Sequence, residues 1–128
     1  MSGFKNKARA IRRLRAMPPA VRKAVRAQLA KNAEELVQTV KAFAPVDEGD
    51  LQASVEQRDT SDASRISREV RVEARDERGR PYPRWVEFGT SDSQPRPFFW
   101  PAYRLKRRRF KSRLTRVARK AIEEAIKR

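Results

Sequence analysis

The feature that most constrains the fold is a stripe of apolar residues that recurs every three or four positions between residues 19 and 43. This spacing places the apolar side chains on one face of an α-helix. Pro18 and Pro19 suit the beginning of such a helix, and Pro45 follows its end. At about 1.5 Å per residue the helix would be roughly 37 Å long, so we expect it to extend past the sheet or to meet another subunit. The stripe consists of Val21, Val25, Leu29, Ala33, Leu36, Val40 and Phe43.

Three shorter segments between residues 51 and 88 predict a small antiparallel sheet. Leu51–Gln57 can form a strand, and Arg68–Ala74 alternates apolar with charged residues, as half-buried strands do. We predict a further strand over Tyr82–Phe88. It would place Trp85 and Glu87 on one face of the sheet, and on the other face Tyr82, Val86 and Phe88.

The segment between the first helix and the first strand, Val46–Asp50, is typical of a tight turn. We expect Gly49 to adopt a backbone conformation that is costly for other residues, and Asp47 or Asp50 to cap exposed backbone N–H groups. The carboxylates of Asp47, Glu48 and Asp50 do not match the spacing of a helix–loop–helix calcium site. Turn and cap chemistry is therefore favoured over a metal site.

A second amphipathic helix is predicted after Pro101 and reaches almost to the C-terminus; its apolar positions are Tyr103, Phe110, Leu114, Val117, Ala121 and Ala125. The predicted fold class is therefore α+β. It has a long N-terminal helix, a small antiparallel sheet of about three to four strands and a C-terminal helix. We expect one domain over residues 19–128, preceded by a basic N-terminal arm over residues 1–18.

The chain contains neither cysteine nor histidine. Disulfides, thiolate zinc sites and nucleophilic catalysis by serine–histidine or cysteine–histidine pairs are excluded within this chain. We therefore predict no enzyme, no cofactor and no metal. The N-terminus lacks the apolar region of a secretory signal, and no uncharged run approaches a membrane span. We expect a protein that acts inside a cell, or in a particle assembled there, without membrane contact.

The formal net charge of +16 is concentrated at the two ends of the sequence. Residues 1–31 carry +10, residues 104–128 carry +10, and the intervening residues carry −4. Solvated helix faces are one explanation, and contact with DNA or an acidic partner is the other. The candidates for such a contact are Arg12, Arg13, Arg15, Arg107, Arg108 and Arg109.

Two motifs carry a resemblance to a known family. Ala44-Pro45-Val46-Asp47-x-Gly49-x-Leu51-x-x-Ser54 is the first. The second combines Tyr82-x-x-x-Val86-Glu87-Phe88-Gly89-Thr90 with Pro95-x-Pro97-Phe98-x-x-Pro101-Ala102. Together they resemble a phage tail-component family, the head–tail joining or tail-completion (neck) proteins of long-tailed phages and gene transfer agents. The resemblance covers roughly residues 20–125; the departures are Glu48, Pro83 and Trp100.

This resemblance implies a structural virion protein that forms a homo-oligomeric ring at the head–tail neck. The ring would join the portal-side connector or adaptor proteins to the tail terminator or tail tube, and DNA would pass through it during ejection. The expected partners therefore include further copies of the chain and, transiently, packaged double-stranded DNA. The expected location is the virion neck or tail, and the host cytoplasm during assembly.

The motif residues divide into two expected roles. Phe98 is expected in the core and Phe99 at an interface, and Glu87 is expected either to pair with Arg84 or Arg104 or to be solvated. The predicted interface residues are Arg84, Trp85, Glu87, Phe99 and Trp100. The predicted structural residues are Pro45, Asp47, Gly49, Leu51, Phe88, Gly89, Thr90, Pro97, Phe98 and Pro101.

A dedicated nucleic-acid-binding protein is the alternative from another functional class. The basic ends support it, but no RNA-recognition, KH, zinc-finger or helix-turn-helix signature is present. Aromatic residues do not interleave with the arginine runs, as single-strand stacking would require. A nuclease would depend on Asp47, Glu48 and Asp50, the only candidate metal ligands.

Overall fold

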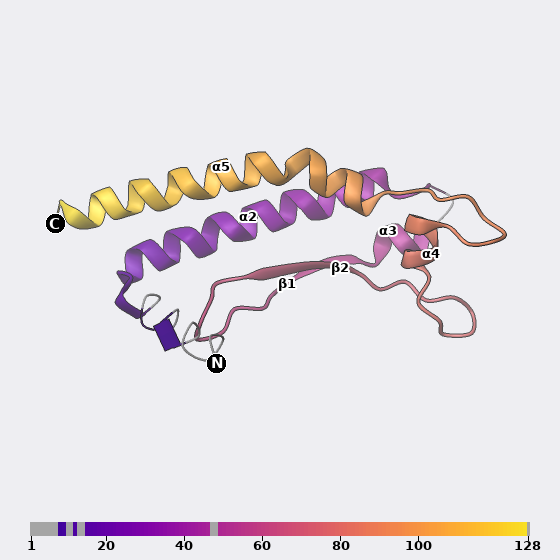
Figure 1. The fold of residues 1–128 in the computed structure, drawn as a ribbon, viewed down its shortest axis with the longest axis horizontal. Coiled ribbons are helices and arrows are strands. Elements are labelled where there is room, and N and C mark those ends of the chain that lie inside the picture. The colour runs from indigo at the N-terminus through magenta and orange to yellow at the C-terminus, as the bar shows by residue number, and fades with distance from the viewer. Residues whose placement is uncertain (1–7, 10–11, 13–14, 47–48, 128) are drawn as a thin grey trace. The chain divides into compact units, whose positions relative to one another are not determined.

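The computed structural model describes residues 8–9, 12, 15–46 and 49–127. The described chain is α+β, with a two-stranded antiparallel sheet of β1 and β2 (Figure 1). In chain order the elements are α2 (Pro19–Phe43), α3 (Gly49–Ala53), β1 (Val55–Asp59), β2 (Arg68–Val72), α4 (Pro83–Phe88) and α5 (Phe99–Ile126). The two long helices predicted from periodicity are confirmed, and α2 has the predicted bounds.

The chain forms two compact units, each assembled from segments far apart in the sequence. Unit 1 consists of Met1–Asn32, Arg58–Glu69 and Arg109–Arg128, and unit 2 consists of Ala33–Gln57 and Val70–Arg108. Each long helix and each strand contributes one part to unit 1 and the other to unit 2.

In unit 1 the C-terminal part of α5 runs antiparallel beside the first half of α2 (Figure 1). Val21 is fully buried there, and Asn32 is buried with its amide paired. The Asn32 side-chain nitrogen donates to the carbonyl oxygen of Phe110 at 3.3 Å, and its oxygen accepts from the Gln28 amide at 3.0 Å. Because a buried amide is costly without partners, this contact fixes where the two helices meet.

Unit 2 contains the main apolar core. Leu51 of α3, Val40 of α2 and Phe98 are each at most 1% exposed, and Ala102 of α5 is fully buried. Lys106 of α5 donates to Glu35 of α2 at 3.1 Å, so the two helices are also joined by a partly shielded ion pair. Helices α2, α3 and α5 and the residue before α5 therefore contribute buried side chains to this core.

The strand predicted over Tyr82–Phe88 is wrong, because Pro83–Phe88 forms helix α4. Pro83 occupies the first turn, where a missing N–H and a fixed φ are favourable, and Gly89 follows the last residue. An isolated antiparallel bridge joins Arg75 to Pro81 just before the segment, and beside it the Tyr82 N–H donates to the Ala74 carbonyl at 3.3 Å. The alternating faces expected of a strand therefore do not exist here.

The other predicted strands need smaller corrections. Leu51 lies in α3 rather than at the start of a strand, and β1 begins only at Val55. The strand predicted over Arg68–Ala74 is confirmed over Arg68–Val72. Gly49 begins α3 without the predicted unusual backbone conformation, and a Cβ there would meet nothing within 4 Å. Asp47 and Glu48 lie outside the described residues.

Candidate interface at the junction of α4 and α5

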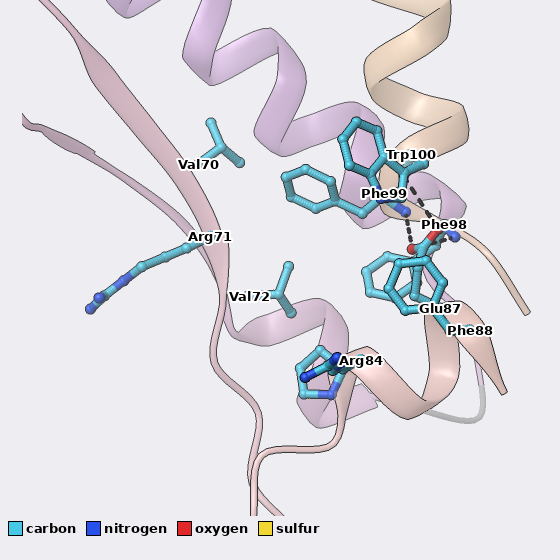
Figure 2. Close-up of a pocket in the computed structure, with 10 residues that line it drawn as sticks. Val70, Arg71, Val72, Arg84, Glu87, Phe88, Phe98, Phe99 and Trp100 are labelled. Carbon is cyan, nitrogen blue, oxygen red and sulfur yellow. Dashed lines mark hydrogen bonds between the residues drawn. The ribbon is translucent and has the colours of Figure 1, made fainter. Parts of the chain in front are cut away.

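A buried glutamate joins the end of α4 to the beginning of α5. Oε1 of Glu87 accepts the backbone N–H groups of Phe98 at 3.1 Å and Phe99 at 2.8 Å, and Oε2 accepts that of Trp100 at 3.4 Å. Figure 2 shows these contacts as dashed lines. The first N–H groups of a helix have no partner within it, and a negative charge complements the helix dipole there. α5 has no acidic residue in its own first turn. Glu87, from another helix, therefore supplies both the hydrogen-bond acceptors and the negative charge.

Pro101 completes this arrangement. It follows Trp100 in the first turn of α5 and has no N–H group that would need a partner. The three N–H groups that precede it are those that Glu87 accepts. Glu87 is 7% exposed, so the cap is formed in a largely dry environment, where such hydrogen bonds are strong.

Gly89 closes the loop that brings the two helices together. Its φ is +77°, a conformation that residues with a Cβ rarely adopt. A Cβ at this position would also lie 2.8 Å from the backbone nitrogen of Pro95. The Gly89 N–H donates to the Trp85 carbonyl at 2.7 Å, and the Arg96 N–H donates to the Val86 carbonyl at 2.8 Å. Glycine is therefore required both by conformation and by the close return of the chain.

Thr90 stabilises the loop through backbone and side-chain contacts. Its N–H donates to the Ser93 carbonyl at 2.9 Å, and its hydroxyl accepts the Asp92 N–H at 3.2 Å. Thr90 thus stabilises the loop through its hydroxyl as well as its backbone. The segment from Glu87 to Pro101 is therefore held at both ends by the Glu87 hydrogen bonds, and its loop is stabilised by hydrogen bonds of its own.

The aromatic side chains at the α4–α5 junction lie in three environments: buried, half-buried and exposed. Phe98 is 1% exposed and belongs to the core, as predicted, whereas Phe99 is half-buried. Trp100 is 48% exposed and packs edge-to-face against Tyr103, with ring centroids 5.8 Å apart. Phe88, at the end of α4, is 62% exposed. Phe88 was predicted on a face of a strand with Tyr82 and Val86; it instead ends helix α4 with its ring largely exposed.

A cleft of about 280 Å³ lies between β2, α4 and the start of α5. In Figure 2, Val70 and Val72 face it from β2, while the Arg71 side chain points away. Arg71 instead pairs with Glu56 at 2.8 Å. The cleft is lined by Val70, Arg71, Val72, Pro83, Arg84, Glu87, Phe88, Phe98, Phe99 and Trp100. Its mainly apolar walls suit the side chains of another protein better than a charged small molecule.

A protein-family model described as "Bacteriophage HK97-gp10, putative tail-component" matches residues 8–89, more than half of the chain. The chain belongs to this HK97-gp10-like family. The resemblance inferred from the two motifs is thereby confirmed at the level of a phage tail component. No curated protein and no solved structure gave a significant match.

The HK97-gp10-like family consists of phage tail components, which are structural, non-enzymatic virion proteins. The matched residues end at Gly89, so they include Glu87 and the whole of α4. The donors that Glu87 caps, and α5 itself, follow the matched region. In this family member, α4 at the end of the matched region is therefore hydrogen-bonded through Glu87 to the start of α5, which lies beyond the match.

The structure brings together most of the predicted interface residues, but it changes the role of Glu87. Arg84, Trp85, Phe99 and Trp100 all lie in unit 2, on α4 or the first turn of α5. Glu87 is neither solvated nor described as paired with Arg84 or Arg104; its carboxylate accepts backbone N–H groups instead. Trp85 is 41% exposed and lies 5.6 Å from the Arg80 guanidinium in a cation–π contact.

The predicted basic contact residues are exposed wherever they are described. Arg12 and Arg15 are exposed, and so are Arg107, Arg108 and Arg109 on α5. Arg13 lies outside the described residues, as does Asp47 of the structural set. Among the remaining structural residues, Leu51 is fully buried, Pro45 and Pro101 are half-buried, and Pro97 is exposed.

The described residues contain neither a metal-ligand cluster nor a membrane-spanning helix. Within residues 8–9, 12, 15–46 and 49–127, no three Asp or Glu side chains gather as metal ligands would. The predicted turn cluster is only partly within these ranges, since Asp47 and Glu48 are not described. In the same part of the chain no helix combines the length and apolarity needed to cross a membrane.

Sequence reasoning missed the cap, although two signals were present. Pro83 followed six residues later by Gly89 is the pattern of a short helix, and a proline inside a strand is unfavourable. The segment before α5, Gln94–Phe98, contains none of the usual capping residues Ser, Thr, Asp or Asn. A long helix without its own cap predicts a capping group from elsewhere in the chain.

Proposed function

We propose that this tail component is a ring-forming subunit of the head–tail neck, which joins the connector to the tail tube and lets DNA pass during ejection. The family match carries this proposal, because it assigns the chain to phage tail components. The two motifs from which the neck position was inferred lie in unit 2. Unit 2 also supplies the aromatic surface that an assembly subunit would use.

The exposed aromatic residues at the α4–α5 junction are the proposed contact surface. Phe88, Trp100 and Tyr103 are 62%, 48% and 38% exposed, respectively. Large rings at this exposure are typical anchors of protein interfaces, where they bury apolar area at a low cost in conformational entropy. The Glu87 cap and the Gly89 loop hold the backbone that carries them. The surface is therefore preorganised, which lowers the ordering cost of binding.

A closed ring needs two different surfaces on each subunit, because head-to-tail contacts repeat around a rotation axis. In this proposal the aromatic surface and its apolar cleft form one of them. The exposed Arg84 guanidinium at the cleft would then favour a carboxylate on the adjoining molecule. Connector and tail-tube proteins would bind at the two ends of the ring.

The deciding experiment is electron microscopy of particles assembled with this gene deleted. We expect filled heads separated from tails, or heads joined to defective tails. Intact and fully joined particles would contradict the neck assignment. Complementation with the wild-type gene should restore normal particles and exclude a polar effect of the deletion on neighbouring genes.

A matched pair of variants tests the contact surface itself. Phe88→Ala and Trp100→Ala should each reduce the yield of joined particles on the order of tenfold, with the purified subunit still folded. Ile126→Ala is the control, because Ile126 is 78% exposed and belongs to unit 1. Equal yields from the aromatic variants and the control would remove the aromatic surface from the proposal while leaving the deletion result to stand.

The alternative, a dedicated nucleic-acid-binding protein, is favoured by one observation, the extreme positive charge. It predicts normal particles from the deleted gene together with lost DNA binding in the cell extract. Charge and assembly do not compete for the same residues, however. The charge distribution supports an additional role.

A further inference from the structure

The entire net charge of the molecule belongs to one of the two units. Unit 1 contains 21 Lys and Arg residues against 5 Asp and Glu residues, whereas unit 2 contains 11 of each. Unit 1 therefore carries the entire net charge of +16, and unit 2 is formally neutral. A charge of this size on one small body creates a strong positive field, which attracts polyanions.

The acidic residues in the strand segment of unit 1 are already engaged within that segment. Glu69 pairs with Arg58 at 2.9 Å, and Asp59 lies 4.0 Å from Arg68. Asp62 accepts the N–H groups of Ser64 and Arg65 at 2.8 and 3.1 Å. The strand segment is internally balanced, with three basic and three acidic residues, so the excess charge lies in the terminal segments.

Four of the basic residues that α5 contributes to unit 1 lie along one face of the helix. Arg109, Arg113, Arg116 and Lys120 are spaced by four, three and four residues, which aligns them along the helix. They span about 16 Å at 1.5 Å per residue. The first acidic residue of α5 is Glu123. The half-buried apolar residues, Phe110, Leu114, Val117 and Ala121, occupy a separate stripe. The basic row therefore lies on a different side of α5 from its apolar stripe.

We propose that this basic face of unit 1 binds the phosphate backbone of double-stranded DNA without reading its sequence. Duplex DNA carries about one negative charge per 1.7 Å, so the row would meet several phosphates. Single-strand binding normally uses aromatic stacking platforms. The described part of unit 1 has one aromatic residue, Phe110, and it is half-buried beside Asn32. The backbone of a duplex is therefore the best-matched ligand.

The test is fluorescence anisotropy of the full chain with a labelled 30-base-pair duplex over a range of salt concentrations. For each phosphate contact the log–log slope of affinity against salt is about −0.9. Arg116→Gln with Lys120→Gln removes two exposed charges of the basic face. The slope should become less steep by about 1.8, and affinity at 0.1 M salt should fall roughly 8-fold per lost contact.

The matched control is Arg75→Gln with Arg78→Gln, two exposed arginines of the neutral unit 2. It makes the same change in net charge and should leave the slope unchanged. Equal losses in both double variants would overturn the proposal, because binding would then follow net charge rather than a site. Glutamine is a good helix former, and circular dichroism should confirm unchanged helix content in all variants.

Two competitors test the class of ligand. Poly-glutamate competing as well as unlabelled duplex, at equal charge, would overturn DNA in favour of an acidic protein partner. Single-stranded DNA binding more tightly than duplex would overturn the duplex assignment. The proposal goes beyond the neck assignment and does not depend on it, since binding is measured on the isolated chain and assembly on particles.

Discussion

Unit 1 and unit 2 share both long helices and both strands, yet they distribute apolar and charged residues in opposite ways. Of the 12 buried apolar residues in the described chain, Val21 alone belongs to unit 1, and the other 11 belong to unit 2. All of the net charge, in contrast, belongs to unit 1. Burial in unit 2 stabilises the fold, while self-repulsion in unit 1 opposes it. Stability and polyanion attraction are thereby carried by different parts of the same helices.

The largest effect should come from the core of unit 2. Phe98→Ala should reduce the free energy of unfolding by about 3–5 kcal/mol, because Phe98 is 1% exposed and leaves a cavity. Urea denaturation should be followed by tryptophan fluorescence and by circular dichroism. Both tryptophans, Trp85 and Trp100, belong to unit 2, so fluorescence reports that unit.

Ile126→Ala in unit 1 is the control for this substitution and should change the free energy of unfolding by no more than about 0.5 kcal/mol. Equal losses from Phe98→Ala and Ile126→Ala would break the distinction between a stabilising and a charged unit. Coincident midpoints from the two probes would show that the units unfold together.

A second prediction separates backbone strain from close packing at the α4–α5 loop. Gly89 and Gly79 have the same φ of +77°, but only at Gly89 would a Cβ meet other atoms, the nearest at 2.8 Å. Gly79→Ala should therefore cost only the conformational penalty of about 1–2 kcal/mol. Gly89→Ala should cost clearly more, about 2–4 kcal/mol in all, because Pro95 must also move.

Gly49→Ala completes the series, because Gly49 has neither a positive φ nor a close neighbour. It should be neutral or slightly stabilising, since alanine reduces the entropy of the unfolded chain. The three variants can be ranked by urea midpoint. An equal loss of unfolding free energy in Gly79→Ala and Gly89→Ala would mean that the loop around Pro95 moves at little cost. The α4–α5 junction would then not be preorganised.

The difference between the predicted and the observed elements has a physical explanation. α2 and α5 were predictable because their apolar residues repeat over many turns, so the helical period is sampled repeatedly. α4 has only six residues, and Tyr82, Val86 and Phe88 also fit alternation over so short a length. Its helical form depends on Pro83, on Gly89 and on contacts with distant segments, which periodicity does not register.

The candidate site was predictable in its residues more than in its geometry. The sequence predicted Trp85, Glu87, Phe99 and Trp100 as interface residues, and all four lie on α4 or in the first turn of α5. The role of Glu87 was not predictable from local pattern, because its acceptor atoms meet donors 11 to 13 residues away. The charge division was likewise hidden, since the neutral unit includes Arg104–Arg108 from the basic C-terminal run.

A third prediction concerns the cap. Glu87→Gln keeps the shape of the side chain but removes its charge and one acceptor oxygen, so it should cost about 2 kcal/mol. Glu56→Gln is the control, because the Glu56–Arg71 pair is largely exposed and should contribute about 0–1 kcal/mol. Hydrogen exchange should show faster opening of the first turn of α5 in Glu87→Gln only. Unchanged exchange there would contradict a capping role.

The smallest predicted effect compares one carboxylate from each unit. Hydrogen bonds from the Ser61 hydroxyl and N–H lower the pKa of Asp59 in unit 1, and the charges of Arg68 and Arg26 lower it further. The backbone N–H of Arg80 lowers the pKa of Asp76 in unit 2, with help from the Arg80 side chain and the Arg78 N–H. Because both folded-state pKa values are lowered, each group stabilises the fold above its unfolded pKa of about 3.9, and this contribution is lost as the pH falls through the folded pKa.

Salt should distinguish the two carboxylates. Charge–charge attraction across solvent is screened by salt, whereas hydrogen bonds in direct contact are screened much less. In addition to the Ser61 hydrogen bonds, the charges of two arginines in the charged unit lower the pKa of Asp59, whereas backbone N–H donors are the main cause of the lowered pKa of Asp76. The pKa of Asp59 should therefore rise more than that of Asp76 between 0.02 and 0.5 M salt. NMR titration of both side chains measures the difference. An equal rise at the two sites would mean that the positive field of unit 1 does not reach its own strand segment, and the electrostatic contrast between the units would then be confined to the helices.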